Sequence, residues 1–198
     1  KNILTKKEPE KSLLISLKRR AGRSRSTGRI TVRHKGGGEK KLYRIIDFSQ
    51  GKINIPAKVT ALEYDPYRNG YIALLEYEDG EKRYILAPQE LKAGDPVIIS
   101  EKADIRPGNR MKLKNIPVGT QVYNIEITPA KGGKLARGAG TSAQVMAHEG
   151  GSVQLQMPSS EVRRVSEECF ASIGAVSRPE YKFINLRKAG RTRHIGRR

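Results

Sequence analysis

The fold is constrained above all by a regular series of short segments rich in β-branched and aromatic residues, each of which is followed by a turn signal. The first series occupies residues 42–48, 57–65, 71–77, 82–87 and 96–100. Gly51 and the runs DPYRNG (65–70) and EDGE (78–81) separate these segments. Asp79-Gly80 is a strong hairpin signal, because a type I′ turn needs positive φ at both central residues. Five short strands at this spacing predict a small closed barrel of the oligonucleotide-binding kind over residues 42–102.

A second series with the same rhythm lies at residues 121–127, 142–149, 152–157, 161–165 and 169–176. The run HEGGS (148–152) is the expected hairpin loop. We therefore expect a second, SH3-like barrel over 121–177, and a linker over 103–120, where two Pro and two Gly occur. A short helix is expected around 180–186. The predicted fold class is all-β: two tandem barrels that fold independently, with extended basic arms at 1–41 and 178–198.

Charge divides the chain into basic ends and an acidic middle. The formal net charge is +19, from 39 Lys/Arg and 20 Asp/Glu. Between Lys18 and Lys41 there are ten basic residues and one acid, Glu39, and residues 181–198 hold seven basic residues and no acid. Residues 53–95 instead hold five basic and eight acidic residues. Such a chain repels itself unless a polyanion compensates it, and arms that grip phosphate around folded bodies would produce this segregation.

The N-terminal basic run has no apolar periodicity, and glycines at 22, 28 and 36–38 would each cost about 1 kcal/mol in a helix. We therefore expect this arm to become ordered only on a polyanion. Nucleic acid is the leading candidate. An anionic membrane is weaker, because the chain has no apolar stretch of membrane-spanning length. Aromatic residues make up only 6% of the chain and Trp is absent, which argues against base stacking as the main binding mode.

Catalytic and metal chemistry find no support in the sequence. The single cysteine, Cys169, excludes an internal disulfide and is expected to be a core thiol. The histidines at 34, 148 and 194 are far apart, so we expect no zinc site. A metal-dependent nuclease would need clustered carboxylates. The dense acids alternate with apolar residues and are better explained as a solvated sheet face: Glu63, Asp65, Glu76, Glu78, Asp79 and Glu81.

Three basic motifs are candidates for phosphate contact. In GRITVRHKGGGEKK (28–41), three glycines allow close approach to a phosphodiester, which Arg29, Arg33, Lys35, Lys40 and Lys41 would neutralise. The alternative is a flexible solvated linker. The loop 128–142 is Gly-rich and tethered at both ends, which lowers the ordering cost when Lys131, Lys134 and Arg137 bind. The alternative there is a mobile surface loop.

The turn YDPYRNG (64–70) is the third motif. Asp65 can bond its own backbone and Pro66 fixes φ, so the turn is expected to be rigid. A rigid turn presents Arg68 in one orientation, as a bidentate phosphate or guanine contact requires. An ordinary tight turn with a solvated arginine explains the same residues equally well.

Three long stretches carry a family resemblance: GRITVRHKGGGEKKLYRIIDF, IPAKVTALEYDPYRNGYIALLEYEDGEKRYILAP and NIPVGTQVYNIEITPAKGGKLARGAGTSAQVMA. From about Gly28 to Arg198 the chain resembles the universal large-subunit ribosomal protein family known as L-two, in its bacterial form. The resemblance implies an oligonucleotide-binding barrel followed by an SH3-like barrel. In the family the chain continues past the equivalent of Arg198 into a Gly/His-rich segment that this sequence does not include.

The resemblance also implies a function. The family is a primary binder of large-subunit rRNA near the peptidyl transferase centre and supports subunit association, so we expect a non-enzymatic role in a cytoplasmic or organellar ribosome. Expected partners are large-subunit rRNA, other ribosomal proteins and small-subunit rRNA across the interface, with no membrane and no homo-oligomer. No cofactor is expected, with Mg²⁺ only as part of the bound RNA. The alternative is a generic nucleic-acid-binding RNA chaperone. The expected RNA-binding residues are Arg29, Arg33, His34, Lys35, Gly36, Gly37, Gly38, Lys40, Arg68, Lys131, Lys134, Arg137, Lys188, Arg191, Arg193, Arg197 and Arg198.

Overall fold

The computed structural model describes residues 4–6, 8–17 and 21–198, and it confirms the all-β fold class. Lys18, Arg19 and Arg20, which belong to the expected N-terminal arm, lie outside the described residues. The strands are β1 (Leu14–Ser16), β2 (Leu42–Arg44), β3 (Ala57–Tyr64), β4 (Tyr71–Tyr77), β5 (Lys82–Leu86), β6 (Pro96–Val97), β7 (Arg110–Lys112), β8 (Gln121–Tyr123), β9 (Ala143–Glu149), β10 (Ser152–Gln156), β11 (Val162–Ser166) and β12 (Phe170–Ile173). The helical elements are the 3-10 turns η1 (Lys11–Leu13), η2 (Leu113–Asn115) and η3 (Pro179–Phe183) and the helix α1 (Ala189–His194). Of the described helices, none is long and apolar enough to cross a membrane.

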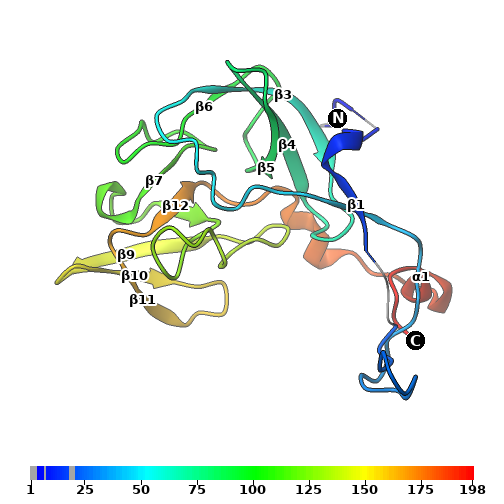
Figure 1. The fold of residues 1–198 in the computed structure, drawn as a ribbon. Coiled ribbons are helices and arrows are strands. Elements are labelled where there is room, and N and C mark those ends of the chain that lie inside the picture. Colours follow the sequence, from blue (N-terminus) through cyan, green and yellow to red (C-terminus); the bar gives the residue numbers. More distant parts are fainter. Residues whose placement is uncertain (1–3, 7, 18–20) are drawn as a thin grey trace.

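The first body is a curled antiparallel sheet in the order β5-β4-β3-β6, with the ribbon β1-β2 beside it (Figure 1). A register shift between Val59 and Ala61 bends β3, as a bulge does. The β4-β5 hairpin forms where Asp79-Gly80 predicts it, but the turn differs from the expected type I′. In the loop 78–80 only Gly80 has positive φ, and its N–H donates to the Tyr77 carbonyl at 2.9 Å. This is a three-residue loop that closes on a left-handed glycine.

The second body is a six-stranded curled sheet in the order β11-β10-β9-β8-β12-β7. The predicted hairpin loop in HEGGS is confirmed between β9 and β10, because Glu149 pairs with Ser152 and both Gly150 and Gly151 have positive φ. Cys169 is fully buried among the apolar side chains of this core, as expected of a core thiol. The two bodies correspond to the oligonucleotide-binding and SH3-like barrels.

Residues 103–120 are part of the second body and do not form the expected linker. They contain β7, which pairs with β12, and η2. Met111, Leu113 and Ile116 are each at most 1% exposed and belong to the second core. The Pro and Gly residues make turns inside this body. Gly108, for example, has φ +98° and its N–H donates to the Ile173 carbonyl of β12 at 3.0 Å.

The two bodies also share a core, contrary to the expectation that they fold independently. Tyr123 and Val176 of the second body pack in one buried cluster with Ile72, Tyr84 and Leu86 of the first. The Tyr123 hydroxyl donates to the Leu86 carbonyl at 3.1 Å. The reason is that β4 and β5 are buried on both faces, which an isolated barrel in water would not allow.

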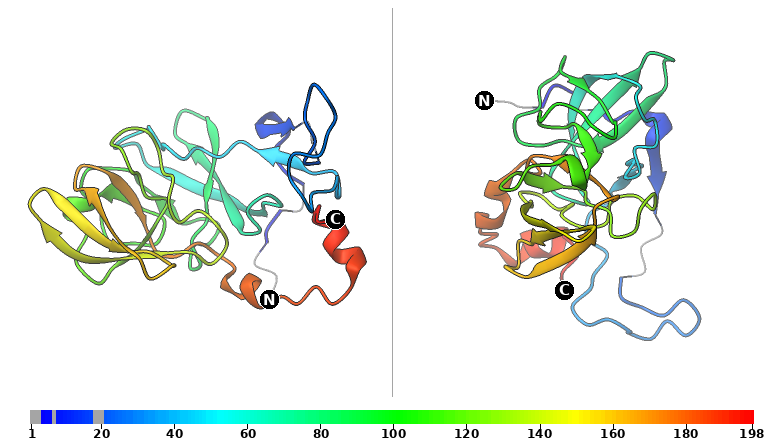
Figure 2. Two further views of the ribbon diagram at one scale, coloured as in Figure 1. Left: turned by 90° about the horizontal axis from the view of Figure 1, so that it is seen from below. Right: turned by 90° about the vertical axis from the view of Figure 1, so that its left-hand side faces the viewer.

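The N-terminal region is also more than an arm. β1 pairs with β2, and the Thr5 hydroxyl accepts a hydrogen bond from the Leu62 N–H of β3 at 2.8 Å. Residues 22–31 then form a hairpin, named here the arm hairpin, closed by a bridge between Arg23 and Ile30. This hairpin projects from the bodies beside the C-terminal segment (Figures 1 and 2).

Candidate nucleic-acid interface

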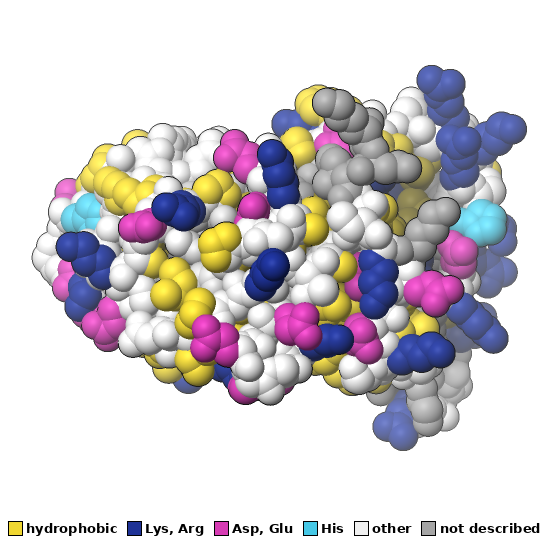
Figure 3. Space-filling model, turned by 90° about the horizontal axis from the view of Figure 1, so that it is seen from above, with side chains coloured by type: hydrophobic (Ala, Val, Ile, Leu, Met, Phe, Trp, Pro, Cys, Tyr) yellow, Lys and Arg dark blue, Asp and Glu magenta, His cyan; other side chains and the backbone are white. Residues whose placement is uncertain are grey.

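The cations of the N-terminal arm (defined by its described residues 21–41) and of the tail (residues 181–198) lack ionic partners. Among the described residues, the salt bridges join side chains outside these two segments. Cations gather at the end of the molecule where the arm and tail lie, while basic and acidic side chains alternate over the bodies (Figure 3). The positive charge of these segments therefore has no compensation within the described structure.

The bodies differ from these segments, because many of their cations are paired with carboxylates. Lys112 and Lys114 both contact the Glu168 carboxylate, at 2.9 and 2.8 Å. Hydrogen bonds from Lys114 and Lys112 lower the pKa of Glu168 to about 2. Lys52 is likewise held between Asp79 and Glu81. A polyanion would have to break these pairs, whereas it meets the arm and tail cations unopposed.

The arm and the tail dock on each other through their main chains. Lys35 and Arg197 form an antiparallel bridge. Three hydrogen bonds connect the same stretches: Gly36 N–H to the Gly196 carbonyl at 2.8 Å, Glu39 N–H to the His194 carbonyl at 2.9 Å, and Arg198 N–H to the His34 carbonyl at 3.2 Å. The structure thus brings together two groups of predicted site residues that lie at opposite ends of the sequence, and the tail is not the extended arm expected, because α1 forms within it.

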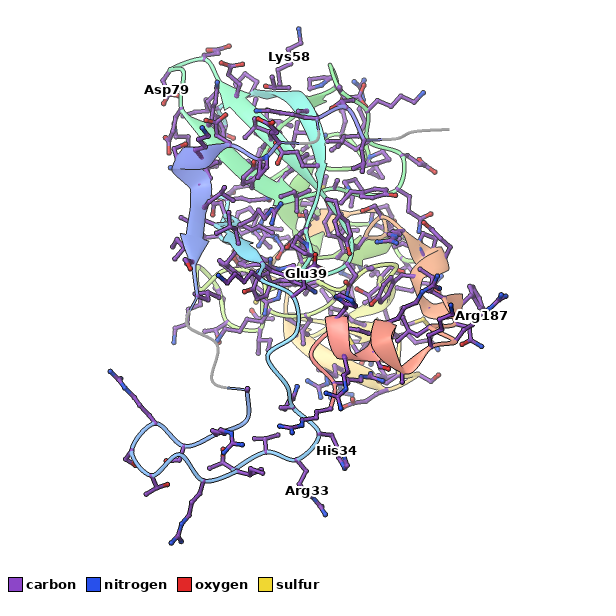
Figure 4. The ribbon with its side chains drawn as sticks, turned by 90° about the vertical axis from the view of Figure 1, so that its right-hand side faces the viewer. Arg33, His34, Glu39, Lys58, Asp79 and Arg187 are labelled. Atoms are coloured by element: carbon purple, nitrogen blue, oxygen red, sulfur yellow. The ribbon has the colours of Figure 1, made fainter. Side chains whose placement is uncertain are left out.

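A cleft of about 880 Å³ opens at this junction. The three-glycine run and Glu39 line it from the arm, and Gly190, which lies in the exposed first turn of α1, borders it from the tail. Its charged side chains are Arg23, Lys35, Glu39, Arg193, Arg197 and Arg198, and the histidines at 34 and 194 also line it. In Figure 4, Arg33 lies away from the bodies, and Arg187 points outward at their edge.

The turn 65–70 is closed by hydrogen bonds of Asp65, as the sequence predicts. The Asp65 carboxylate accepts the Tyr67 N–H at 2.9 Å, and the Asp65 N–H donates to the Gly70 carbonyl at 3.0 Å. Arg68, however, is turned inward: it pairs with the buried Asp65 and donates to the Tyr43 hydroxyl at 2.7 Å. Its side chain is only 16% exposed. The guanidinium therefore braces the turn, and its contact with RNA stays a prediction.

Phe48 joins this turn to the loop 128–142. The Arg68 guanidinium lies 5.0 Å from the centre of the Phe48 ring, and the Arg137 guanidinium lies 4.4 Å from the same ring. Cation–π contacts of this kind fix both arginines. The Gly133 N–H also donates to the Phe48 carbonyl at 3.0 Å. The two arginines singled out from the sequence thus belong to one cluster, built on a ring that the sequence analysis did not select.

A buried ion pair holds the base of the loop 128–142. Arg110 is fully buried, and its guanidinium lies 3.1 Å from the Glu126 carboxylate and 2.7 Å from the Asn124 carbonyl. Burial lowers the pKa of Arg110, and the Glu126 carboxylate opposes that shift. The other Glu126 oxygen accepts backbone N–H groups of Phe170 at 3.1 Å and Ala130 at 3.3 Å. This network fixes where the loop leaves the second body.

The loop itself presents Lys131 and Lys134. Both lysines are exposed, and among the described residues neither is paired with a carboxylate. The remaining predicted site residues of the arm and tail are largely exposed, and Gly36 is half-buried. Sequence reasoning missed Phe48, Tyr43 and Gly196, because only contacts between distant segments reveal them.

The prediction that the dense acidic residues form a solvated sheet face is wrong for two of them. Glu76, Glu78, Asp79 and Glu81 are exposed, as expected of a solvated face. Glu63 and Asp65 are instead 2% and 0% exposed. Glu63 accepts the Tyr84 hydroxyl at 2.7 Å, and burial raises the pKa of Glu63. No group of three or more potential metal ligands occurs among the residues that the structure describes.

Two family models match the sequence. The model described as Ribosomal Proteins L2, RNA binding N-terminal domain, matches residues 10–99. The model described as Ribosomal Proteins L2, C-terminal domain, matches residues 106–198. The two matches together span nearly the whole chain, and the second begins just before β7, where the second body begins.

Proposed function

The chain belongs to the ribosomal protein L2 family, and from this premise we propose that it is a primary binder of large-subunit rRNA that stabilises RNA packing. The family makes it a structural constituent of the large ribosomal subunit, located in the ribosome with rRNA and other ribosomal proteins. The finer elements of the proposal are a position near the peptidyl transferase centre, support of subunit association and contact with small-subunit rRNA. These elements rest on the resemblance of the arm, turn and loop motifs.

The single observation that carries the proposal is the placement of uncompensated cations. They lie on the arm, the tail and the loop 128–142, whereas the cations of the two bodies are largely paired. Solubility alone does not require a protein to separate its cations in this way. Binding of phosphate by particular segments does require it, because the cations must then lie on those segments.

The implied mechanism is structural. A-form RNA hides its bases in a deep, narrow groove, so recognition is of shape, phosphate and 2′-hydroxyl. The shared core fixes the two bodies relative to each other, and the Phe48 cluster fixes the turn and the loop on one side of them. Neutralised RNA segments can then pack closely. Peptidyl transfer is then catalysed by RNA, and Mg²⁺ enters only with the bound RNA. The ribosome is a cytoplasmic or an organellar one.

The test is binding of purified protein to large-subunit rRNA fragments and to a competitor duplex of equal charge, over a salt series. About ten phosphate contacts would give a log–log salt slope of roughly −7 to −9. We expect a preference for one rRNA fragment, weakened by Lys131→Ala and Lys134→Ala. Lys58→Ala is the matched control, because Lys58 is also exposed but lies on the acidic first body, far from the arm (Figure 4). Equal binding to every duplex would instead identify a generic RNA chaperone.

A further inference from the structure

Two like-charged segments pack against each other at the arm–tail junction. The cleft there is lined by five cations, Arg23, Lys35, Arg193, Arg197 and Arg198, and by one acid, Glu39. None of these side chains forms a salt bridge in the part of the chain that the structure describes. Repulsion between such charges opposes the docking, and main-chain hydrogen bonds hold it together.

The main chains approach so closely that glycine is required at the joint. Gly38 has φ +63°, and a Cβ placed there would lie 2.8 Å from the Gly196 nitrogen and 2.9 Å from the His194 carbonyl oxygen. Real Cβ atoms do not come this near to backbone, so a side chain at Gly38 would separate the segments. A Cβ added at Gly28, which shares the positive φ but lies outside the cleft, would meet no atom within 4 Å.

The chemistry of the cleft defines its occupant. Cations on both walls call for an anion that is large enough to face both, and exposed backbone at the glycines allows close approach. The apolar side chains of Ile30 and Val32, 67% and 50% exposed, line the same cleft. A phosphodiester backbone, with anionic phosphates and the carbon-rich face of ribose, matches these walls.

We propose that the arm and the tail form one composite clamp for a single phosphodiester segment of RNA, and that the Gly38–Gly196 joint pre-organises it. The inference rests on the proposed function and assigns to it a site that neither segment makes alone. Pre-organisation reduces the entropy lost on binding, so the two sets of cations must act as a unit. Their contributions to affinity are then coupled and not simply additive.

The first test uses glycine variants of the full chain with the preferred large-subunit rRNA fragment. We expect Gly38→Ala to weaken binding about tenfold, which corresponds to about 1.4 kcal/mol. Gly28→Ala controls for strain at positive φ, because Gly28 does not line the cleft. It should bind within about twofold of the unaltered chain. Equal losses in the two variants would overturn the role of the joint.

The second test is a double-mutant cycle that does not depend on the joint. Lys35→Ala and Arg197→Ala are combined, because these residues face each other across the junction. The control cycle pairs Lys35→Ala with Arg187→Ala, because Arg187 does not line the cleft and points outward at the edge of the molecule (Figure 4). We expect coupling in the first cycle only, with thermal unfolding nearly unchanged in every variant because these side chains lie outside the buried cores.

The outcomes separate this inference from the proposed function. Additive losses in both cycles, with the rRNA preference of the unaltered chain intact, would overturn the clamp and leave rRNA binding standing. If the unaltered chain shows no preference for rRNA over the duplex of equal charge, the proposed function fails first. Coupling in the first cycle together with a selective loss in Gly38→Ala supports the clamp.

Discussion

Removal of one partner of the buried Arg110–Glu126 pair should be severely destabilising. The two side chains are 0% and 2% exposed, and their nitrogen and oxygen lie 3.1 Å apart. Arg110→Met leaves the Glu126 carboxylate buried without its cation, and Glu126→Gln leaves the guanidinium without its anion. Each change should lower the free energy of unfolding by about 3–5 kcal/mol, since a buried charge is then uncompensated.

The double variant sharpens this prediction. Arg110→Met with Glu126→Gln removes both charges, and the glutamine oxygen can still accept the Phe170 and Ala130 N–H groups that Glu126 now accepts. Its cost should therefore be smaller than the sum of the two single costs by about 2 kcal/mol or more. The surface pair Arg163–Glu161 is the matched control, because its atoms lie 3.0 Å apart but its side chains are 47% and 54% exposed.

Urea unfolding followed by tyrosine fluorescence would measure these free energies, since the chain has eight Tyr and no Trp. Arg163→Met should change the free energy of unfolding by less than about 1 kcal/mol. The reasoning is refuted if Arg110→Met costs no more than this surface control, or if the double-variant cost equals the sum of the single costs within about 0.5 kcal/mol.

Three further predictions concern the buried residues Glu63, Cys169 and Gly133. Glu63→Gln should raise stability at neutral pH, because one oxygen of the buried carboxylate has no partner. The raised pKa of Glu63 means that the folded state holds its proton more tightly, so this gain should vanish as pH falls below the usual glutamate range; a gain independent of pH would contradict the argument. Cys169 should resist alkylation in the folded protein and react once unfolded, because it is fully buried and burial raises the pKa of its thiol to about 11; rapid native-state modification, read by mass spectrometry, would disprove this. Gly133→Ala should lower the thermal unfolding midpoint, because its Cβ would clash with the backbone carbonyl oxygen of Asn124 at 2.4 Å, while Gly138→Ala in the same loop should leave it nearly unchanged.

The local pattern of the sequence determined most of the secondary structure and the distribution of charge. The strand segments at 57–65, 71–77, 142–149 and 152–157 lie where β-branched and aromatic residues alternate between turn signals, and β3, β4, β9 and β10 occupy them. The Asp65 carboxylate accepts the N–H of Tyr67, two residues further on, so this turn could also be predicted from local sequence. These features depend on residues a few positions apart, and sequence patterns report such interactions directly.

Long-range packing decided what the sequence left open. The Pro and Gly content of 103–120 fits a linker and a set of turns equally well, and only the pairing of β7 with β12 distinguishes the two. The sequence pattern predicts that Glu63 is exposed on its strand, but Glu63 is buried and accepts a hydrogen bond from the Tyr84 hydroxyl of another strand. The shared core likewise depends on Tyr123 and Val176 reaching β4 and β5.

Some features of the candidate interface could likewise be predicted from the sequence, and others depend on the tertiary structure. Residue types alone identify the cations and the glycine-rich segments that hold them, because charge and backbone freedom are properties of single residues. Tertiary structure decided how they are grouped: Arg68 and Arg137 on Phe48, and the arm against the tail at Gly38 and Gly196. The physical reason is that these groupings bring together segments far apart in the chain, and the entropy of closing such loops is offset only when the whole fold forms.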